Sequence, residues 1–189
     1  MRLVQRLRAL IRSERGFSLI ELVASMAILM TVMGGLTALL VSGTNAEVDM
    51  NRRFQAQSEA RLGLDKLRRD VHCAWNVSPA GTSATKTLTM NASCPSSGGS
   101  TSITWCTVAN GTGRYGLWRY AAATCSGGTG VKVADYLTVQ NAFSYTAPIA
   151  GSKELKTLGT TLAVNLTPTR PERVYSLQDN LVLRNSVRA

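Results

Sequence analysis

The chain has 189 residues, which is enough for one domain with appended segments and too few for two full domains. Its formal net charge is +10, but five arginines and one glutamate in residues 1–16 account for +4 of this total. The remaining +6 is spread over residues 17–189 and does not by itself identify a nucleic-acid-binding protein. A short basic segment in front of an apolar run is instead typical of the cytoplasmic side of a membrane span.

The apolar run follows this basic segment directly. Residues 22–41 contain 20 amino acids without a charge, and a helix of that length measures about 30 Å, the thickness of a bilayer's hydrocarbon core. The run is longer than the apolar part of a conventional signal peptide, so any cleavage is expected in front of it. The sequence therefore predicts a transmembrane helix over residues 17–41.

Glu21 is the acidic residue at the head of this predicted helix. An acidic residue at the centre of a membrane helix costs roughly 2.5 to 3.5 kcal/mol on insertion scales, so ionisable residues in such helices mark functional sites. The alternative reading is an interfacial anchor, with Glu21 at the level of the lipid headgroups. We interpret Glu21 as functional.

The helical pattern continues beyond the membrane-length run. Apolar residues recur at spacings of three and four, with charged residues between them, which is typical of an amphipathic helix over residues 42–75. Asn76 and Pro79 are expected to end it. The sequence thus predicts one helix over residues 17–75, its second half packed on a soluble core. The apolar stripe comprises Ala60, Leu64, Leu67, Val71 and Ala74 or Trp75.

Residues 76–189 have a different character and are predicted to form a globular β-rich domain. After a loop at residues 77–86, short β-like runs alternate with stretches rich in Gly, Pro, Ser and Thr. The expected fold class is α+β, with a small antiparallel sheet laid against the second half of the long helix. The expected strands cover residues 87–90, 103–108, 115–121, 137–145, 160–166 and 173–183.

Four cysteines, Cys73, Cys94, Cys106 and Cys125, lie beyond the apolar run. If the amino end is cytoplasmic, the region that holds them is exported into an oxidising space where disulfides persist. No pair has the spacing of a metal site, and the single histidine is His72. The cysteines are therefore candidates for two disulfides.

The clearest predicted hairpin has an Asn-Gly turn within residues 103–120. Its expected register places Cys106 opposite Leu117 and brings Cys125 near residues 94–98. This favours the pairs Cys94–Cys125 and Cys73–Cys106. The sequential pairs Cys73–Cys94 and Cys106–Cys125 stay open, because sequence alone does not fix the connectivity.

Residues 15–40, RGFSLIELVASMAILMTVMGGLTALL, closely resemble the class III signal and amino-terminal helix of type IV pilins and type II secretion pseudopilins. The resemblance rests on Gly, Phe, Ser, Leu, Ile and Glu in unbroken order behind a basic leader. It implies that a prepilin peptidase cleaves between Gly16 and Phe17, removes the leader of residues 1–16, and methylates the new amino terminus of Phe17.

The resemblance also gives Glu21 a role. Cleavage leaves a positively charged amino terminus in the bilayer region. An unpaired charge is costly in this low-dielectric surrounding, and a nearby carboxylate neutralises it. In the family this glutamate is thought to pair with the terminus of a neighbouring subunit and to set the axial register of the filament. Glu21 is therefore the expected assembly residue.

The resemblance to this family covers residues 10–75, in the motif and in the arrangement of the long helix. The globular part resembles the family in architecture alone. Major pilins often carry a cysteine pair near the carboxyl end and a proline where this chain has Ala38; no cysteine here follows Cys125. Together with the LRRD of residues 67–70, these features resemble minor pilins and the J-type pseudopilin. The implied function is a non-enzymatic subunit of a type IV pilus or a type II secretion pseudopilus.

The implied partners are the prepilin peptidase, other pilin or pseudopilin subunits, the inner-membrane assembly platform and, before assembly, membrane lipid. The implied location is the cytoplasmic membrane, crossed once with the amino terminus inside and the globular domain outside. The subunit would then enter a periplasmic or extracellular filament.

Catalysis, metals and cofactors are not expected. A triad would need support beyond His72, which lies at a predicted helix end. The glycines at 111, 113 and 116 lie in a hairpin and lack the strand-to-helix context of a phosphate loop.

Two other functions remain open. One is a tip-located binding pilin for DNA uptake or adhesion, since aromatic side chains near arginines can stack on bases or sugars; the simpler reading is that these aromatics pack the sheet on the helix. The other is an unprocessed single-span membrane protein whose exported domain acts alone. The aromatic group comprises Trp105, Tyr115, Trp118 and Tyr120, near Arg114 and Arg119.

Overall fold

A computed structural model gives the structure of the chain and describes residues 18–91, 93–126, 129–149, 154–167 and 170–186. The chain divides into two compact units, residues 1–48 and residues 49–189. The predicted leader and the predicted first mature residue, Phe17, lie outside the described residues.

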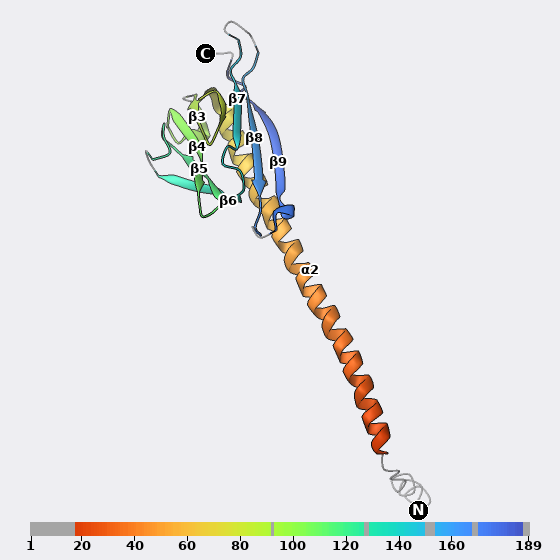
Figure 1. Cartoon of the computed structure of the whole chain (residues 1–189). Helices are drawn as coiled ribbons and strands as arrows, with labels where there is room; N and C mark the ends of the chain where they lie inside the picture. The colour runs from red at the N-terminus through yellow and green to blue at the C-terminus, as the bar shows by residue number, and fades with distance from the viewer. Residues whose placement is uncertain (1–17, 92, 127–128, 150–153, 168–169, 187–189) are drawn as a thin grey trace, which may run out of the picture. The chain divides into compact units, whose positions relative to one another are not determined.

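Helix α2 runs from Leu19 to Cys73 without interruption and belongs to both units (Figure 1). This confirms the long amino-terminal helix. The helix ends before Asn76, because the chain enters strand β1 (Ala74–Ser78), which pairs with β3 (Thr85–Met90). In the first unit the helix is long and apolar enough to cross a membrane.

In the second unit the helix buries one face. The predicted stripe is confirmed for its helical members, from Ala60 to Val71, whereas residues 74 and 75 lie in β1. The structure adds Ala56, Gly63 and Asp70 to the buried face. A methyl group at Gly63 would approach Ala134 Cβ to 3.3 Å and Leu117 Cδ2 to 3.4 Å, so this glycine lets the helix lie close to the sheet. The buried face comprises Ala56, Ala60, Gly63, Leu64, Leu67, Asp70 and Val71.

The sheet of the described residues is antiparallel, with the order β1-β3-β4-β5-β6-β8-β7-β2 and with β9 paired to the other side of β8 (Figure 1). The α+β fold with one long helix on an antiparallel sheet is therefore confirmed. The other strands are β2 (Gly81–Ser83), β4 (Ser102–Ala109), β5 (Tyr115–Tyr120), β6 (Gly130–Leu137), β7 (Phe143–Thr146), β8 (Thr157–Val164) and β9 (Tyr175–Val182).

One loop prediction and one strand prediction were wrong. The expected loop at residues 77–86 contains the end of β1, all of β2 and the start of β3. The expected strand at residues 137–145 spans the end of β6, a connection and the start of β7. Strand β6 is hard to recognise because Lys132 and Asp135 interrupt its apolar residues, so it lacks a clear alternation of period two.

The core lies between the helix and the sheet. Because every strand contributes to a single sheet whose inner face packs on one helix, the apolar side chains form one continuous cluster. Its fully buried members include Leu67, Val71, Leu88, Ile103, Trp105, Leu117, Leu137, Phe143, Leu158 and Leu162.

The four cysteines form two disulfides, Cys73–Cys94 and Cys106–Cys125, with Cα–Cα distances of 5.7 Å and 6.2 Å. The favoured pairing was therefore wrong, and the structure has the sequential alternative. The reason is the register: Cys106 lies opposite Trp118, one residue from the expected partner. The first bridge joins the end of α2 to the segment after β3.

A buried polar cluster fastens the helix to the sheet. Trp105 Nε1 donates to Asp70 Oδ2 at 3.0 Å, and Arg119 Nε donates to the same oxygen at 2.7 Å. The Asp70 side chain is 2% exposed and that of Arg119 15%. A buried carboxylate is tolerated only when it is paired and hydrogen-bonded, and Asp70 meets both conditions.

We predict that Asp70→Ala lowers the free energy of unfolding by roughly 3 to 5 kcal/mol, because it leaves the Arg119 charge and the indole N–H of Trp105 without this acceptor. Urea unfolding of the detergent-solubilised chain, followed by tryptophan fluorescence, measures the change. The matched control is Asp65→Ala, which removes a carboxylate that is 63% exposed and pairs with Arg68; it should cost less than about 1 kcal/mol. Equal effects of the two substitutions would contradict the role of Asp70.

Candidate functional site

The first unit presents an apolar helical surface. Every residue from 18 to 48 is exposed, including Leu19 at 82%, Ile20 at 76% and Leu39 at 72%. A helix that is apolar around its circumference is stable only in lipid or among other apolar helices. This segment therefore needs a membrane or partner helices.

Several hydroxyl groups on this helix donate to its own backbone carbonyls. Ser25 donates to the carbonyl of Leu22 at 2.9 Å, and Thr37 donates to that of Met33 at 2.8 Å. Thr31 and Thr44 donate in the same way to carbonyls three residues earlier. Because a polar group in hydrocarbon needs an internal partner, these hydroxyls are compatible with burial in lipid.

Glu21 lies in the first turn of α2 as the structure describes it. Its backbone N–H donates to the carbonyl of Ser18 at 2.9 Å, so the helical turn begins at Ser18. A carboxylate at this position interacts favourably with the positive end of the helix dipole. The predicted cleavage and methylation positions, Gly16 and Phe17, precede this turn and lie outside the described residues.

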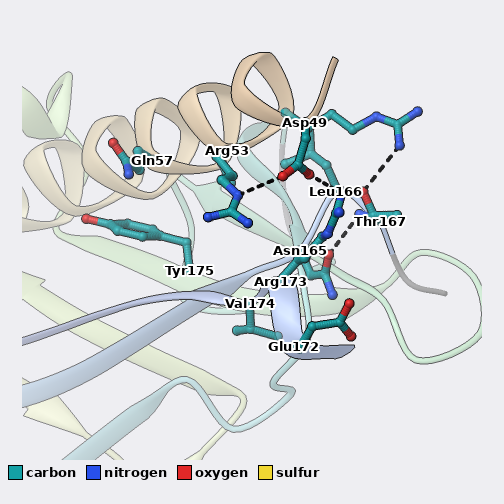
Figure 2. Close-up of a pocket in the computed structure, with 12 residues that line it drawn as sticks. Asp49, Arg53, Gln57, Asn165, Leu166, Thr167, Glu172, Arg173, Val174 and Tyr175 are labelled. Carbon is teal, nitrogen blue, oxygen red and sulfur yellow. Dashed lines mark hydrogen bonds and ion pairs between the residues drawn. The ribbon is translucent and has the colours of Figure 1, made fainter. Parts of the chain in front are cut away.

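In the second unit, a cavity of about 170 Å³ lies between the helix and the connection from β8 to β9, which includes the 3-10 helix η2 (Pro171–Arg173). Figure 2 shows the Asp49 carboxylate between Arg53, on the helix, and this connection. Arg53 Nε donates to Asp49 Oδ2 at 3.1 Å, and Arg173 forms an ion pair with Asp49 Oδ1.

The connection is also ordered by its own hydrogen bonds. The side-chain amide of Asn165 donates to the carbonyl of Arg170 at 3.0 Å, and its oxygen accepts from the backbone N–H of Thr167 at 2.8 Å. Arg52 also reaches this connection, with Nη1 3.5 Å from Thr167 Oγ1. Asp49 pairs with Arg53 on the helix and with Arg173 on the connection. We therefore interpret these ion pairs as a brace that ties the connection to the helix.

The structure divides the predicted group of aromatics and arginines. Trp105 and Arg119 point inward and bind Asp70, so the simpler reading, packing of the sheet on the helix, holds for Trp105. Trp118 and Tyr120 lie on the opposite face of β5, with ring centroids 6.3 Å apart. Arg114 lies over the ring of Tyr136, 5.3 Å from its centroid. The group does not form one face.

His72 lies in the last turn of α2 and is half-buried. Burial lowers its pKa, and the neighbouring positive charges of Arg184 and Arg68 lower it further. The amide of Asn185 donates to the carbonyls of His72 and Cys73 at 3.3 and 3.4 Å, so the end of the described chain caps the helix. Among the described residues, no cluster of three potential metal ligands occurs.

Sequence reasoning missed Lys86. Its side chain is fully buried, and Nζ donates to the carbonyls of Pro79 at 2.5 Å and Gly81 at 2.7 Å. Burial lowers the pKa of Lys86, because a low-dielectric surrounding disfavours the charged form. Lys86 lies at the end of the loop expected at residues 77–86, and no sequence signal marks the turn that encloses it.

We predict that Asp49→Ala loosens the connection between β8 and β9. Removing the acceptor of Arg53 and Arg173 should raise amide hydrogen exchange at residues 170–176 roughly tenfold, which corresponds to about 1.4 kcal/mol. Hydrogen exchange with mass spectrometry measures this. Arg53→Ala is the control: its side chain is 64% exposed, and Arg173 keeps its partner, so exchange should change by less than about threefold. Unchanged protection in Asp49→Ala would contradict the proposed brace.

Comparison with known proteins gives one match. Residues 11–37 match the protein-family model described as "Prokaryotic N-terminal methylation motif". No curated protein and no solved structure matches the chain. The match begins in the basic segment and continues into the exposed apolar part of α2.

Proposed function

We propose that this chain, which carries the prokaryotic N-terminal methylation motif of the class III type IV pilin signal at residues 11–37, is a minor pilin or a pseudopilin that assembles through its amino-terminal helix. The motif supports a type IV pilin-like or pseudopilin-like protein, and it is the observation that carries the proposal. The exposed apolar helix and the α+β fold of the second unit agree with it.

Processing would create the functional amino terminus. A prepilin peptidase would cleave between Gly16 and Phe17 and methylate Phe17. Because α2 is already helical at Leu19, the new terminus would lie about one helical turn before Glu21. Its positive charge would enter the bilayer region close to a carboxylate.

Glu21 would then contribute to assembly in two environments. In the membrane, its carboxylate offsets the charge of an amino terminus in low dielectric. In a filament, the same carboxylate would pair with the terminus of a neighbouring subunit, so that subunits associate in one axial register. The apolar surface of residues 18–48 would pass from lipid contact to contact with other helices.

The second unit would form the filament surface or tip and contribute no catalysis. The apolar helix and the motif are consistent with membrane anchoring, and we propose a single crossing with this unit outside the cytoplasm. Disulfides in this unit fit an exported location. DNA uptake is a weaker alternative, because Arg119 and Arg114 engage Asp70 and Tyr136.

We predict that co-expression with an active prepilin peptidase shortens the chain by residues 1–16 and leaves one added methyl group on Phe17. Intact mass and peptide mapping of the amino terminus measure both changes. Gly16→Asp is the control variant, and it should remain full-length because the resemblance implies cleavage after a glycine. A full-length wild-type chain beside a peptidase that cuts another prepilin would contradict the proposal.

We predict that Glu21→Ala preserves cleavage but lowers incorporation into filaments by roughly tenfold or more, because the amino terminus loses the carboxylate that offsets its charge in low dielectric. Immunoblotting of sheared filaments against the membrane fraction measures incorporation. The matched control is Glu47→Ala, which removes an exposed carboxylate from the same helix beyond the membrane-length run. Normal incorporation of Glu21→Ala would contradict the assembly role.

A further inference from the structure

The outer face of β5 carries two aromatic side chains. Antiparallel pairing puts Trp118 beside Cys106 and Lys132, and Tyr120 beside Thr104 and Gly130. Arg119, between them in the sequence, points to the opposite face and reaches Asp70 on the helix. The helix therefore covers the inner face of these strands, whereas Trp118 and Tyr120 lie on the outer face and are half-buried.

Two glycines give these rings their positions. A methyl group at Gly130 would meet the Tyr120 ring atoms Cε1 and Cζ at 2.4 and 2.5 Å. A methyl group at Gly116 would meet Trp118 Nε1 at 2.9 Å. Each ring thus occupies the space that a side chain would otherwise fill, and so lies down on the strands. The interplanar angle is 28°, so the two rings form one shallow platform.

The platform has a polar border on the β4 side. The Cys106–Cys125 disulfide ties residues 121–126 to β4 beside Trp118. Thr104 Oγ1 donates to the carbonyl of Ala122 at 2.7 Å, which fixes the same segment. Thr124 and Ser126 in this segment are exposed. Two exposed hydroxyl residues therefore flank Cys125 on a segment that the disulfide holds to the strand beside Trp118.

The described charges next to the platform are paired. Lys132 Nζ lies 2.6 Å from Asp135 Oδ2, and Arg119 Nε lies 2.7 Å from Asp70 Oδ2. Proteins that bind nucleic acid rely on cations that neutralise phosphates, which makes their affinity strongly dependent on salt. A flat aromatic surface with internally neutralised charges and a hydroxyl border suits a neutral, hydroxyl-rich ligand instead.

We propose that the surface formed by Trp118, Tyr120 and residues 121–126 binds a neutral oligosaccharide. The C–H groups on one face of a sugar ring carry partial positive charge, and the face of an aromatic ring is negative, so the two surfaces attract each other. The sugar hydroxyls would meet the hydroxyls of Tyr120 and Thr124 and the ammonium of Lys132 at the edge. This would make the second unit a carbohydrate-binding module.

The proposal is independent of filament assembly. It requires only that the second unit face the exterior, and a chain that fails to assemble would still bind sugar. It gives the adhesive alternative a specific surface and a chemical class of ligand.

The test uses the full chain in a zwitterionic detergent, because a glucoside or maltoside headgroup would compete for the platform. Cellotetraose, chitotetraose and maltotetraose are titrated separately, with saturation-transfer NMR and equilibrium dialysis as readouts. We expect at least one of them to bind, and Trp118→Ala to weaken that binding roughly tenfold or more, as the loss of one aromatic stacking partner does elsewhere.

Gly130→Ala is the sharper variant, because it keeps both aromatics and adds a methyl group where the Tyr120 ring lies. Binding should again weaken by roughly tenfold, since the displaced ring no longer forms the platform. The control is Trp75→Ala, which should leave binding unchanged. Trp75 is half-buried in β1, and Lys156 Nζ lies 5.9 Å from its ring centroid. Intact disulfides and an unchanged circular dichroism spectrum verify the fold of each variant.

Three results would overturn the proposal. The first is no binding of any of the three oligosaccharides to the wild-type chain. The second is binding that Trp118→Ala and Gly130→Ala leave unchanged. The third is tighter binding of an oligothymidylate that is lost in Trp118→Ala and falls steeply with salt, since this would assign the platform to nucleic acid.

Discussion

The fold of the second unit depends on one buried interaction, the contact of Asp70 with Trp105 and Arg119. Burial of the apolar face alone would hold a helix on a sheet without fixing its position along its axis, because hydrophobic contact is not directional. A carboxylate that must meet an indole N–H on β4 and a guanidinium on β5 fixes that position. Gly63 permits the close approach of the helix to the sheet, and the Cys73–Cys94 bridge holds the helix end in the same position.

The single helix α2 meets two different requirements along its length. Residues 18–48 are exposed and apolar, with hydroxyls that bond to their own backbone, so this part is suited to lipid or to other helices. From Ala56 onward one face is buried against the sheet and the other is charged. Between these parts, Asp49 and Arg53 begin the charged segment that braces the β8–β9 connection. The change of character along one helix is what the proposed subunit, with a membrane segment and an exported domain, would require.

The helix could be predicted from the sequence because its signals are local. The uncharged run, the position of Glu21 and the recurrence of Ala60, Leu64 and Leu67 each follow from spacing along the chain. The methylation motif is likewise continuous, and its family model matches at residues 11–37. Strand β2 was missed because its pairing partner, β7, is distant in sequence, and β6 was missed because its own pattern is weak. Lys86 escaped notice because no sequence signal marks the turn that supplies its acceptors, the carbonyls of Pro79 and Gly81.

The β4–β5 hairpin illustrates how much depends on register. The expected register would have put Trp118 opposite Trp105 and Leu117 opposite Cys106. The observed register puts Arg119 opposite Trp105 and Trp118 opposite Cys106. A shift of one residue exchanges the two faces of a strand, so the same difference redirects Cys106 to Cys125, brings Arg119 to Asp70, and leaves Trp118 and Tyr120 on the outer face. The contact of Arg119 with Asp70, the Cys106–Cys125 disulfide and the aromatic platform are therefore three consequences of one pairing. A change that shifted this hairpin would disrupt all three together.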